Sequence, residues 1–206
     1  MTLSGKAPGN PVIRMGMDPK CADMTRGRQV VQEQALVNAK GDIANVFVYL
    51  DGNFPATPVP TTPVVIDQRM CVYALRVVGM RVGQRLQIRN SDELLHNVHG
   101  SSATSNSFNV AQAHAGASFE FTPKAPEIMV KVGCDVHRWM TAFVGVVSHP
   151  YFAVTDANGQ FTIPRVPPGT YTLKMWHEQF GERRQTLVVR AGAPTPADAV
   201  FQNAQR

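Results

Sequence analysis

The chain has 206 residues, of which 44% are hydrophobic and 17% charged, so it is long and apolar enough to bury a core without extra cross-links. Its net charge of +5 comes from arginines scattered along the sequence, which argues against nucleic acid as a partner. No stretch reaches the roughly 18 consecutive apolar residues of a membrane span.

Turn-forming residues and short β-type runs predict an all-β chain, with 16 glycines and 15 prolines. Residues 1–42 lack clear periodicity, and a helical turn is expected somewhere in residues 25–38. Residues 44–50 are β-branched and aromatic, which predicts a strand. Four prolines between Pro55 and Pro63 then predict a stiff connector and a candidate domain boundary.

Strand signals come close together after this connector. The predicted strands are residues 63–67, 73–78, 84–89, 95–99, 108–110, 117–122, 127–132 and 141–147. Short strands at this spacing are typical of a Greek-key sandwich. Four more strands are predicted at residues 151–155, 159–163, 170–176 and 184–190, and residues 191–206 are expected to form a tail.

A metal-ligand pattern lies between the last two strands of the first group. Cys134, His137 and Met140 have C-x2-H-x2-M spacing, and a second imidazole is available upstream from the segment that contains His96 and His99. Two histidines and one cysteine with a weak axial methionine are the ligands of a blue-copper electron-transfer centre. Zinc is the main rival because it also accepts cysteine and histidine, and the thioether is what favours copper.

The two remaining cysteines indicate in which cellular compartment the protein works. If Cys134 is a ligand, Cys21 and Cys71 form an even pair, which predicts a disulfide in an oxidising compartment. The alternative is two buried free thiols. The first six residues show no signal-peptide pattern, so the protein is either cytosolic or exported with its signal removed. The disulfide favours a periplasmic or exported protein.

Residues 64–147 resemble the cupredoxin family, and the two ligand segments are most similar to its amicyanin branch, which shares the C-x2-H-x2-M loop and an H-N-V-H run. The resemblance implies four copper ligands, which are His96, Cys134, His137 and Met140. It also implies an electron carrier, and no enzyme, that exchanges single electrons with a cytochrome or another copper protein. His99 is then expected to have a structural role.

The same resemblance implies residues around the ligands. The backbone N–H of Asn97 should donate to the Cys134 sulfur, and Val136, which replaces the proline of amicyanin, should supply a second N–H. His137 should lie near the surface as the electron port. Arg138 beside it, together with Trp139, would then form a docking site for an acidic partner. The alternative is a solvated arginine next to a core tryptophan.

Residues 155–163, followed by 166–173, resemble the carboxypeptidase regulatory-like or transthyretin-like β-sandwich. In that family an early strand directly precedes the segment that begins here at Tyr151. The resemblance therefore implies a cupredoxin domain at residues 55–149, inserted in or packed on a second sandwich of residues 1–54 and 150–190. A bond between Cys21 and Cys71 would tie the two domains together.

Two other functions remain open from the sequence. The chain could be a copper-storage or structural module with a cupredoxin shape, or a subunit of a larger redox complex in which the second sandwich is the docking element. A copper oxidoreductase would need a further catalytic copper with its own histidines, and the sequence shows no such set.

Overall fold

The computed structural model describes residues 1–203 and divides the chain into two compact units, each made of separate stretches of sequence. Unit 1 contains residues 1–10, 33–57 and 149 onward, and unit 2 contains residues 11–32 and 58–148. Strands form nearly all of the regular structure in both units, which confirms the all-β fold class. Residues 11–32 belong to unit 2 and not, as predicted, to the second sandwich.

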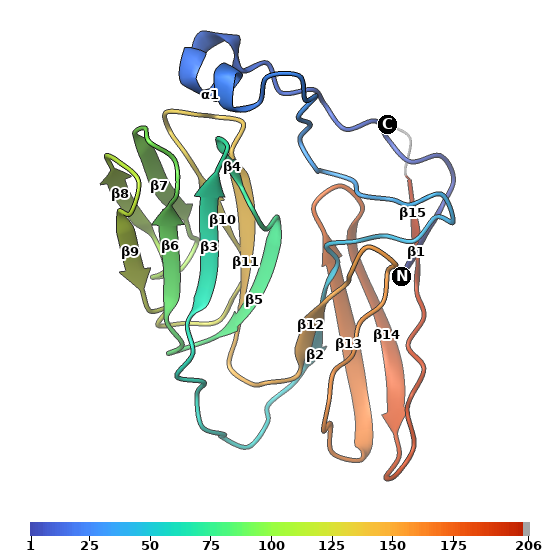
Figure 1. The fold of residues 1–206 in the computed structure, drawn as a ribbon. Helices are drawn as coiled ribbons and strands as arrows, with labels where there is room; N and C mark the ends of the chain where they lie inside the picture. Colours follow the sequence, from blue (N-terminus) through green and yellow to red (C-terminus); the bar gives the residue numbers. More distant parts are fainter. Residues whose placement is uncertain (204–206) are drawn as a thin grey trace. The chain divides into compact units, whose positions relative to one another are not determined.

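Unit 2 is built from two sheets (Figure 1). The five-stranded sheet has the order β5-β11-β10-β7-β8, and the four-stranded sheet has the order β4-β3-β6-β9. The strands are β3 (Val64–Arg69), β4 (Val72–Tyr73), β5 (Val77–Arg81), β6 (Leu86–Asn90), β7 (His96–Ser101), β8 (Phe108–Gln112), β9 (Ser118–Phe121), β10 (Glu127–Gly133) and β11 (Thr141–Val147). The single strand predicted at residues 73–78 is divided between β4 and β5.

Alternating side chains of these strands form the core of unit 2. In β6, Leu86 and Ile88 are buried while the arginine at position 89 is exposed, as expected for a strand with one face in the core and the other toward solvent. Cys134 and Met140 belong to the same buried cluster as Leu86 and Ile88. The candidate ligands therefore extend a hydrophobic core, which holds them in place on one side.

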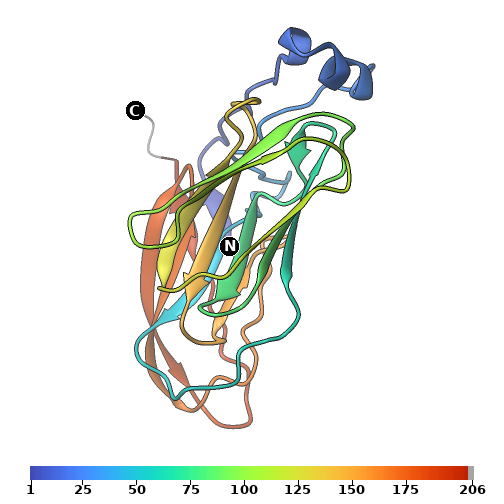
Figure 2. The same ribbon diagram turned by 90° about the vertical axis from the view of Figure 1, so that its left-hand side faces the viewer.

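Residues 11–32 form what we call the cap segment. It contains a short 3-10 helix, η1 (Met15–Met17), and the helix α1 (Pro19–Met24), and its ends are joined by an antiparallel bridge between Val12 and Val31. In both views α1 lies beyond the strand ends of the unit 2 sandwich (Figure 1, Figure 2). No helix was predicted at these positions, and the turn expected in residues 25–38 is replaced by this earlier helix.

Unit 1 combines a four-stranded sheet of order β12-β2-β13-β14 with a two-stranded sheet, β1-β15. Its strands are β1 (Thr2–Ser4), β2 (Phe47–Asp51), β12 (Phe152–Val154), β13 (Gly169–His177), β14 (Gly181–Val189) and β15 (Val200–Gln202). β2 pairs with both β12 and β13, so an early segment is flanked by two late ones. This arrangement explains why the intervening sequence can form a separate unit.

Two predictions for unit 1 are wrong. Residues 159–163 form no strand, since Asp156 instead closes a tight turn whose backbone N–H groups at positions 158 and 160 donate to its carboxylate. The expected tail contains β15, which pairs in parallel with β1 and buries Phe201 completely. The sequence around β15 is rich in alanine and proline, which are rare in strands, so this strand of three residues was not predicted.

Among residues 1–203, neither helix is long and apolar enough to cross a membrane.

Phe201 provides a test of this corrected C-terminal strand. Replacing Phe201 with Ala should lower the free energy of unfolding of unit 1 by about 3–5 kcal/mol, because a fully buried aromatic ring leaves a cavity. Val200→Ala, at an adjacent and 56% exposed position, should change it by less than about 0.5 kcal/mol. Urea unfolding followed by Trp176 fluorescence in a Trp139→Phe background measures both, and equal effects would contradict a packed β15.

Candidate metal centre

β7 determines which of its two histidines faces the core. Side chains alternate along a strand, so His96 and Val98 point inward, whereas His99 points to the other face. His96 is fully buried, and His99 is partly exposed with its Nδ1 3.1 Å from a carboxylate oxygen of Asp135. The alternation explains why only His96 can contribute to a buried site.

The loop of residues 134–140 joins β10 to β11. Gly133 and Thr141 are paired across these antiparallel strands, so Cys134 and Met140 begin and end the loop next to each other. The Met140 N–H donates to the His137 carbonyl at 2.8 Å, which tightens the loop and turns His137 toward His96. Strand pairing thus converts the C-x2-H-x2-M spacing into one local cluster.

Three donor atoms converge between these elements. The Nδ1 atoms of His96 and His137 are 3.0 Å apart, and the Cys134 Sγ lies 4.0 and 3.8 Å from them, respectively. A point in the plane of such a triangle is about 2.1 Å from each corner, close to the usual metal–nitrogen and metal–sulfur lengths of about 2.0 and 2.3 Å. The donor set and its spacing therefore fit one metal ion.

Burial separates this cluster from water. The exposed fractions are 0% for His96, 3% for Cys134, 1% for His137 and 1% for Met140. Met140 packs in the same core cluster as Cys134, which makes its thioether the nearby candidate for a fourth, weak ligand. A buried thiolate and two imidazoles are suited to a metal and are expensive to leave without a partner.

Two backbone N–H groups donate to the Cys134 sulfur. One belongs to Asn97 at 3.3 Å, the donor that the cupredoxin resemblance implies. The other belongs to His137 at 3.4 Å, so the expectation that Val136 supplies it is wrong. Val136 is 48% exposed and projects from the loop, because the turn directs the N–H of the next residue back toward the sulfur.

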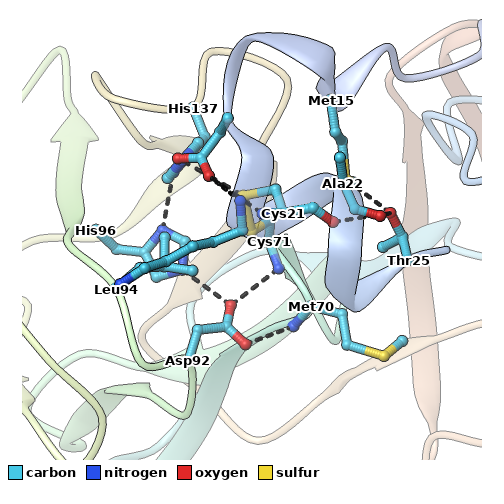
Figure 3. The surroundings of a disulfide bond; sticks show 12 residues. Met15, Cys21, Ala22, Thr25, Met70, Cys71, Asp92, Leu94, His96 and His137 are labelled. Carbon is cyan, nitrogen blue, oxygen red and sulfur yellow. Dashed lines mark hydrogen bonds and ion pairs between the residues drawn. A yellow bond between two sulfur atoms is a disulfide. The ribbon is translucent and has the colours of Figure 1, made fainter.

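Each imidazole also has a carboxylate on its outer nitrogen. The Nε2 of His96 lies 2.9 Å from Asp92, which is itself buried and accepts the N–H groups of Met70 and Cys71 (Figure 3). The Nε2 of His137 lies 3.1 Å from Asp18. Such carboxylates fix the tautomer, so that Nδ1 is the free donor nitrogen, and make the imidazole a better ligand.

Asp18 reaches His137 because it also caps α1. Its Oδ1 accepts the N–H groups of Lys20 and Cys21, while Oδ2 faces the imidazole. Asp followed by Pro19 is a strong helix-start signal, since the side chain satisfies free N–H groups and proline fits the first helical position. The geometry of a helix terminus thus places one carboxylate over His137.

A disulfide joins Cys21 to Cys71 and links the two carboxylate arrangements (Figure 3). Cys21 donates its N–H to Asp18, Cys71 donates its N–H to Asp92, and the Cys21 sulfur lies 3.5 Å from the His137 Nε2. Both cysteines belong to unit 2, so the bond does not tie the two units together as predicted. As a disulfide, these sulfurs are not thiolate ligands for a second ion.

The cap segment changes the expected electron port. His137 is covered by α1 and the disulfide and is not near the surface, so the prediction of an exposed ligand edge is wrong. Trp139 is partly buried and donates its indole N–H to the Cys71 carbonyl at 2.8 Å, which is a packing role. Arg138 is the exposed member of the predicted docking pair.

The ionisable groups are strongly coupled. Burial alone would lower the pKa of His96, but the hydrogen bonds to Asp92 and Cys134 raise it to about 9. Burial alone would raise the pKa of Cys134, but hydrogen bonds from His96, Asn97 and His137 lower it to about 7. The hydrogen bond from His137 lowers the pKa of Asp18. Without a metal, the surroundings therefore favour a Cys134 thiolate beside a protonated His96. A metal ion bound there would displace the His96 Nδ1 proton, as metal binding at such ligands releases protons.

Sequence reasoning missed Asp18 and Asp92. The Asp-Pro helix start would have located Asp18 near a helix, although nothing local connects it to His137, which is 119 positions away. Asp92 lies four positions before His96 in a turn, and a carboxylate near a ligand histidine is a usable signal for an outer partner.

Comparisons with known proteins match parts of the chain. Residues 142–202 match the family model for the carboxypeptidase regulatory-like domain. A "Putative rhamnogalacturonase" of Neurospora crassa is 37% identical over 62 residues, which is 28% of this chain. The match spans 12% of that relative's length.

Several solved structures are similar to part of the chain. One is a Cu-containing nitrite reductase from Thermus scotoductus, with a TM-score of 0.40 at 16% identity over 48% of this chain and 25% of that one. Another is a purple cupredoxin from Nitrosopumilus maritimus, with a TM-score of 0.36 at 20% identity over 41% of this chain and 99% of that one. Amicyanin from Paracoccus versutus gives a TM-score of 0.38 at 18% identity, over 48% of this chain and 97% of that one.

The two outer carboxylates can be tested separately. Asp92→Asn and Asp18→Asn should each weaken Cu(I) binding about 10- to 100-fold, because each releases one imidazole from its fixed orientation. Asp23→Asn, which alters an exposed carboxylate on the same helix as the Asp18 cap, should leave the affinity unchanged. Competition with a chromophoric Cu(I) chelator measures all three, and normal affinity in both test variants would show that the carboxylates do not position the ligands.

Proposed function

We propose that unit 2 holds one copper ion and serves as a one-electron carrier. The ion would be held by the Nδ1 atoms of His96 and His137 and the Sγ of Cys134, with the Met140 thioether as a fourth, weak ligand. The observation that carries this proposal is the buried triangle of two nitrogens and one sulfur, in which both outer nitrogens are held by carboxylates.

Copper bound by this donor set would supply a Cu(II)/Cu(I) couple. The residues around it keep one arrangement in place during a change of charge. β7 holds His96, the paired ends of β10 and β11 hold Cys134 and Met140, and the cap segment holds His137. The two N–H groups on the Cys134 sulfur stabilise the thiolate, and burial excludes water and other ligands.

The same geometry bears on the alternatives. A storage site has to release its metal, whereas here both imidazoles are anchored by side chains that are themselves hydrogen-bonded. Zinc would accept the three donors, but a buried thioether is a soft ligand that suits copper. We therefore favour electron transfer over storage and copper over zinc, with a redox protein as the partner.

The disulfide supports a location for this activity. A buried disulfide next to the ligands is compatible with an oxidising compartment, so we place the protein in the periplasm or outside the cell. Unit 1 has its own core and contributes none of the proposed ligands, which leaves it free to attach the carrier to a larger redox assembly.

Metal titration of the purified chain tests the proposal. One equivalent of Cu(II) should produce an intense visible band from the Cys134 thiolate, and the band should disappear in Cys134→Ser. Met140→Leu should retain the band with an altered reduction potential, because it removes the axial thioether while nearly conserving volume. A colourless one-to-one complex of the unaltered chain, or a preference for zinc under competition, would contradict the electron-carrier assignment.

A further inference from the structure

A surface hollow of about 360 Å³ reaches the candidate ligands of unit 2 on a side other than the cap segment. Cys134 and Met140 form part of its lining, as do Gly133 and Thr141 at the ends of β10 and β11. His96 and His137 are not among the residues that line it. The hollow is thus the place where a molecule outside the protein can come close to Cys134 and Met140, although both residues are themselves buried.

Positive charges predominate around this hollow. Lys131 and Arg138 line it with exposed side chains, and the partly exposed His99 is a further lining residue. The one acidic lining residue, Asp135, is already paired with His99 at 3.1 Å. Its negative charge is therefore partly engaged, while the lysine and arginine remain available to an anion.

The cap side of the site is covered by protein atoms. The ring of His137 is covered there by α1 and the disulfide, and the nearest charged group is the Asp18 carboxylate, whose side chain is 30% exposed. A partner with acidic groups would meet the exposed Lys20 and Arg26 there as well as Asp18, and it would still be separated from His137 by the helix. The route through His137 is thus unfavourable in distance, because this side chain is only 1% exposed beneath the cap segment.

Resting on the proposed copper function, we propose that the hollow of Cys134, Met140, Lys131 and Arg138 is the electron port, and that it docks a redox protein with an acidic surface around its own centre. Electrons then pass through the Cys134 side of the site and not through the edge of His137. Lys131 and Arg138 provide steering, and the net charge of +5 on the chain adds long-range attraction.

Anion binding to the metal-free protein tests the docking surface independently of copper. Hexacyanocobaltate(III), a redox-inert trivalent anion, is titrated into the apo-protein while the backbone amide signals are recorded by NMR. Saturable shifts should centre on residues 99, 131, 135 and 138. Shifts centred on the cap residues 20–26, or no saturable shift, would overturn the proposed surface even if the copper function is correct.

Kinetics of the copper-loaded protein then test the port. Oxidation of the reduced protein by hexacyanoferrate(III) should slow about tenfold or more at low ionic strength in Lys131→Glu/Arg138→Glu, and the difference should shrink in high salt. Lys20→Glu, a matched charge reversal on the cap, should change the rate less than twofold. Lys131→Glu alone provides a milder variant, and an unchanged visible band in each protein shows that the ligands are intact.

The two failures are distinguishable. If the cap variant slows the reaction as much as the double variant does, the port lies at His137 and our proposal is wrong while the copper function stands. If the unaltered chain forms no redox-active thiolate–copper complex, the proposed function fails, and the NMR titration still reports on the anion surface.

Discussion

The pairing of each ligand imidazole with a carboxylate is the interaction on which the candidate centre depends. Without Asp92 and Asp18, neither histidine would have a defined tautomer, and the two rings would be free to rotate away from the Cys134 sulfur. With them, both Nδ1 atoms point to a common position with the sulfur. The rest of unit 2 can be understood as the support for these two carboxylates.

The disulfide is central to that support. It joins two segments 50 residues apart, and each of its cysteines donates a backbone N–H to one of the two carboxylates. In the loop-entropy description, a bond of this span stabilises a fold by about 4 kcal/mol. It fixes a helix of six residues, too short to be stable alone, on top of His137. A histidine that would otherwise face solvent is therefore buried.

Local patterns in the sequence were sufficient for most of the strands and for placing Cys134, His137 and Met140 in one loop, because period-two alternation and loop spacing are local signals. The assignment of these residues and His96 as copper ligands stays a prediction. The hydrogen bond from the Asn97 N–H to the Cys134 sulfur was predicted from the resemblance to the cupredoxin family. The sequence could not reveal that Asp18 reaches His137, because that contact joins residues 119 positions apart and depends on how the cap segment folds back. The buried position of His137, the packing role of Trp139 and the pairing of β15 with β1 are long-range outcomes of the same kind.

X-ray absorption at the copper edge tests the central claim most directly. In copper-loaded protein, the account predicts two nitrogen donors at about 2.0 Å from copper and one sulfur at a short copper–sulfur distance, with imidazole scattering from two rings. The sulfur contribution should be absent in Cys134→Ser. A first shell made only of nitrogen and oxygen, or one with two thiolate sulfurs from Cys21 and Cys71, would contradict the proposed centre.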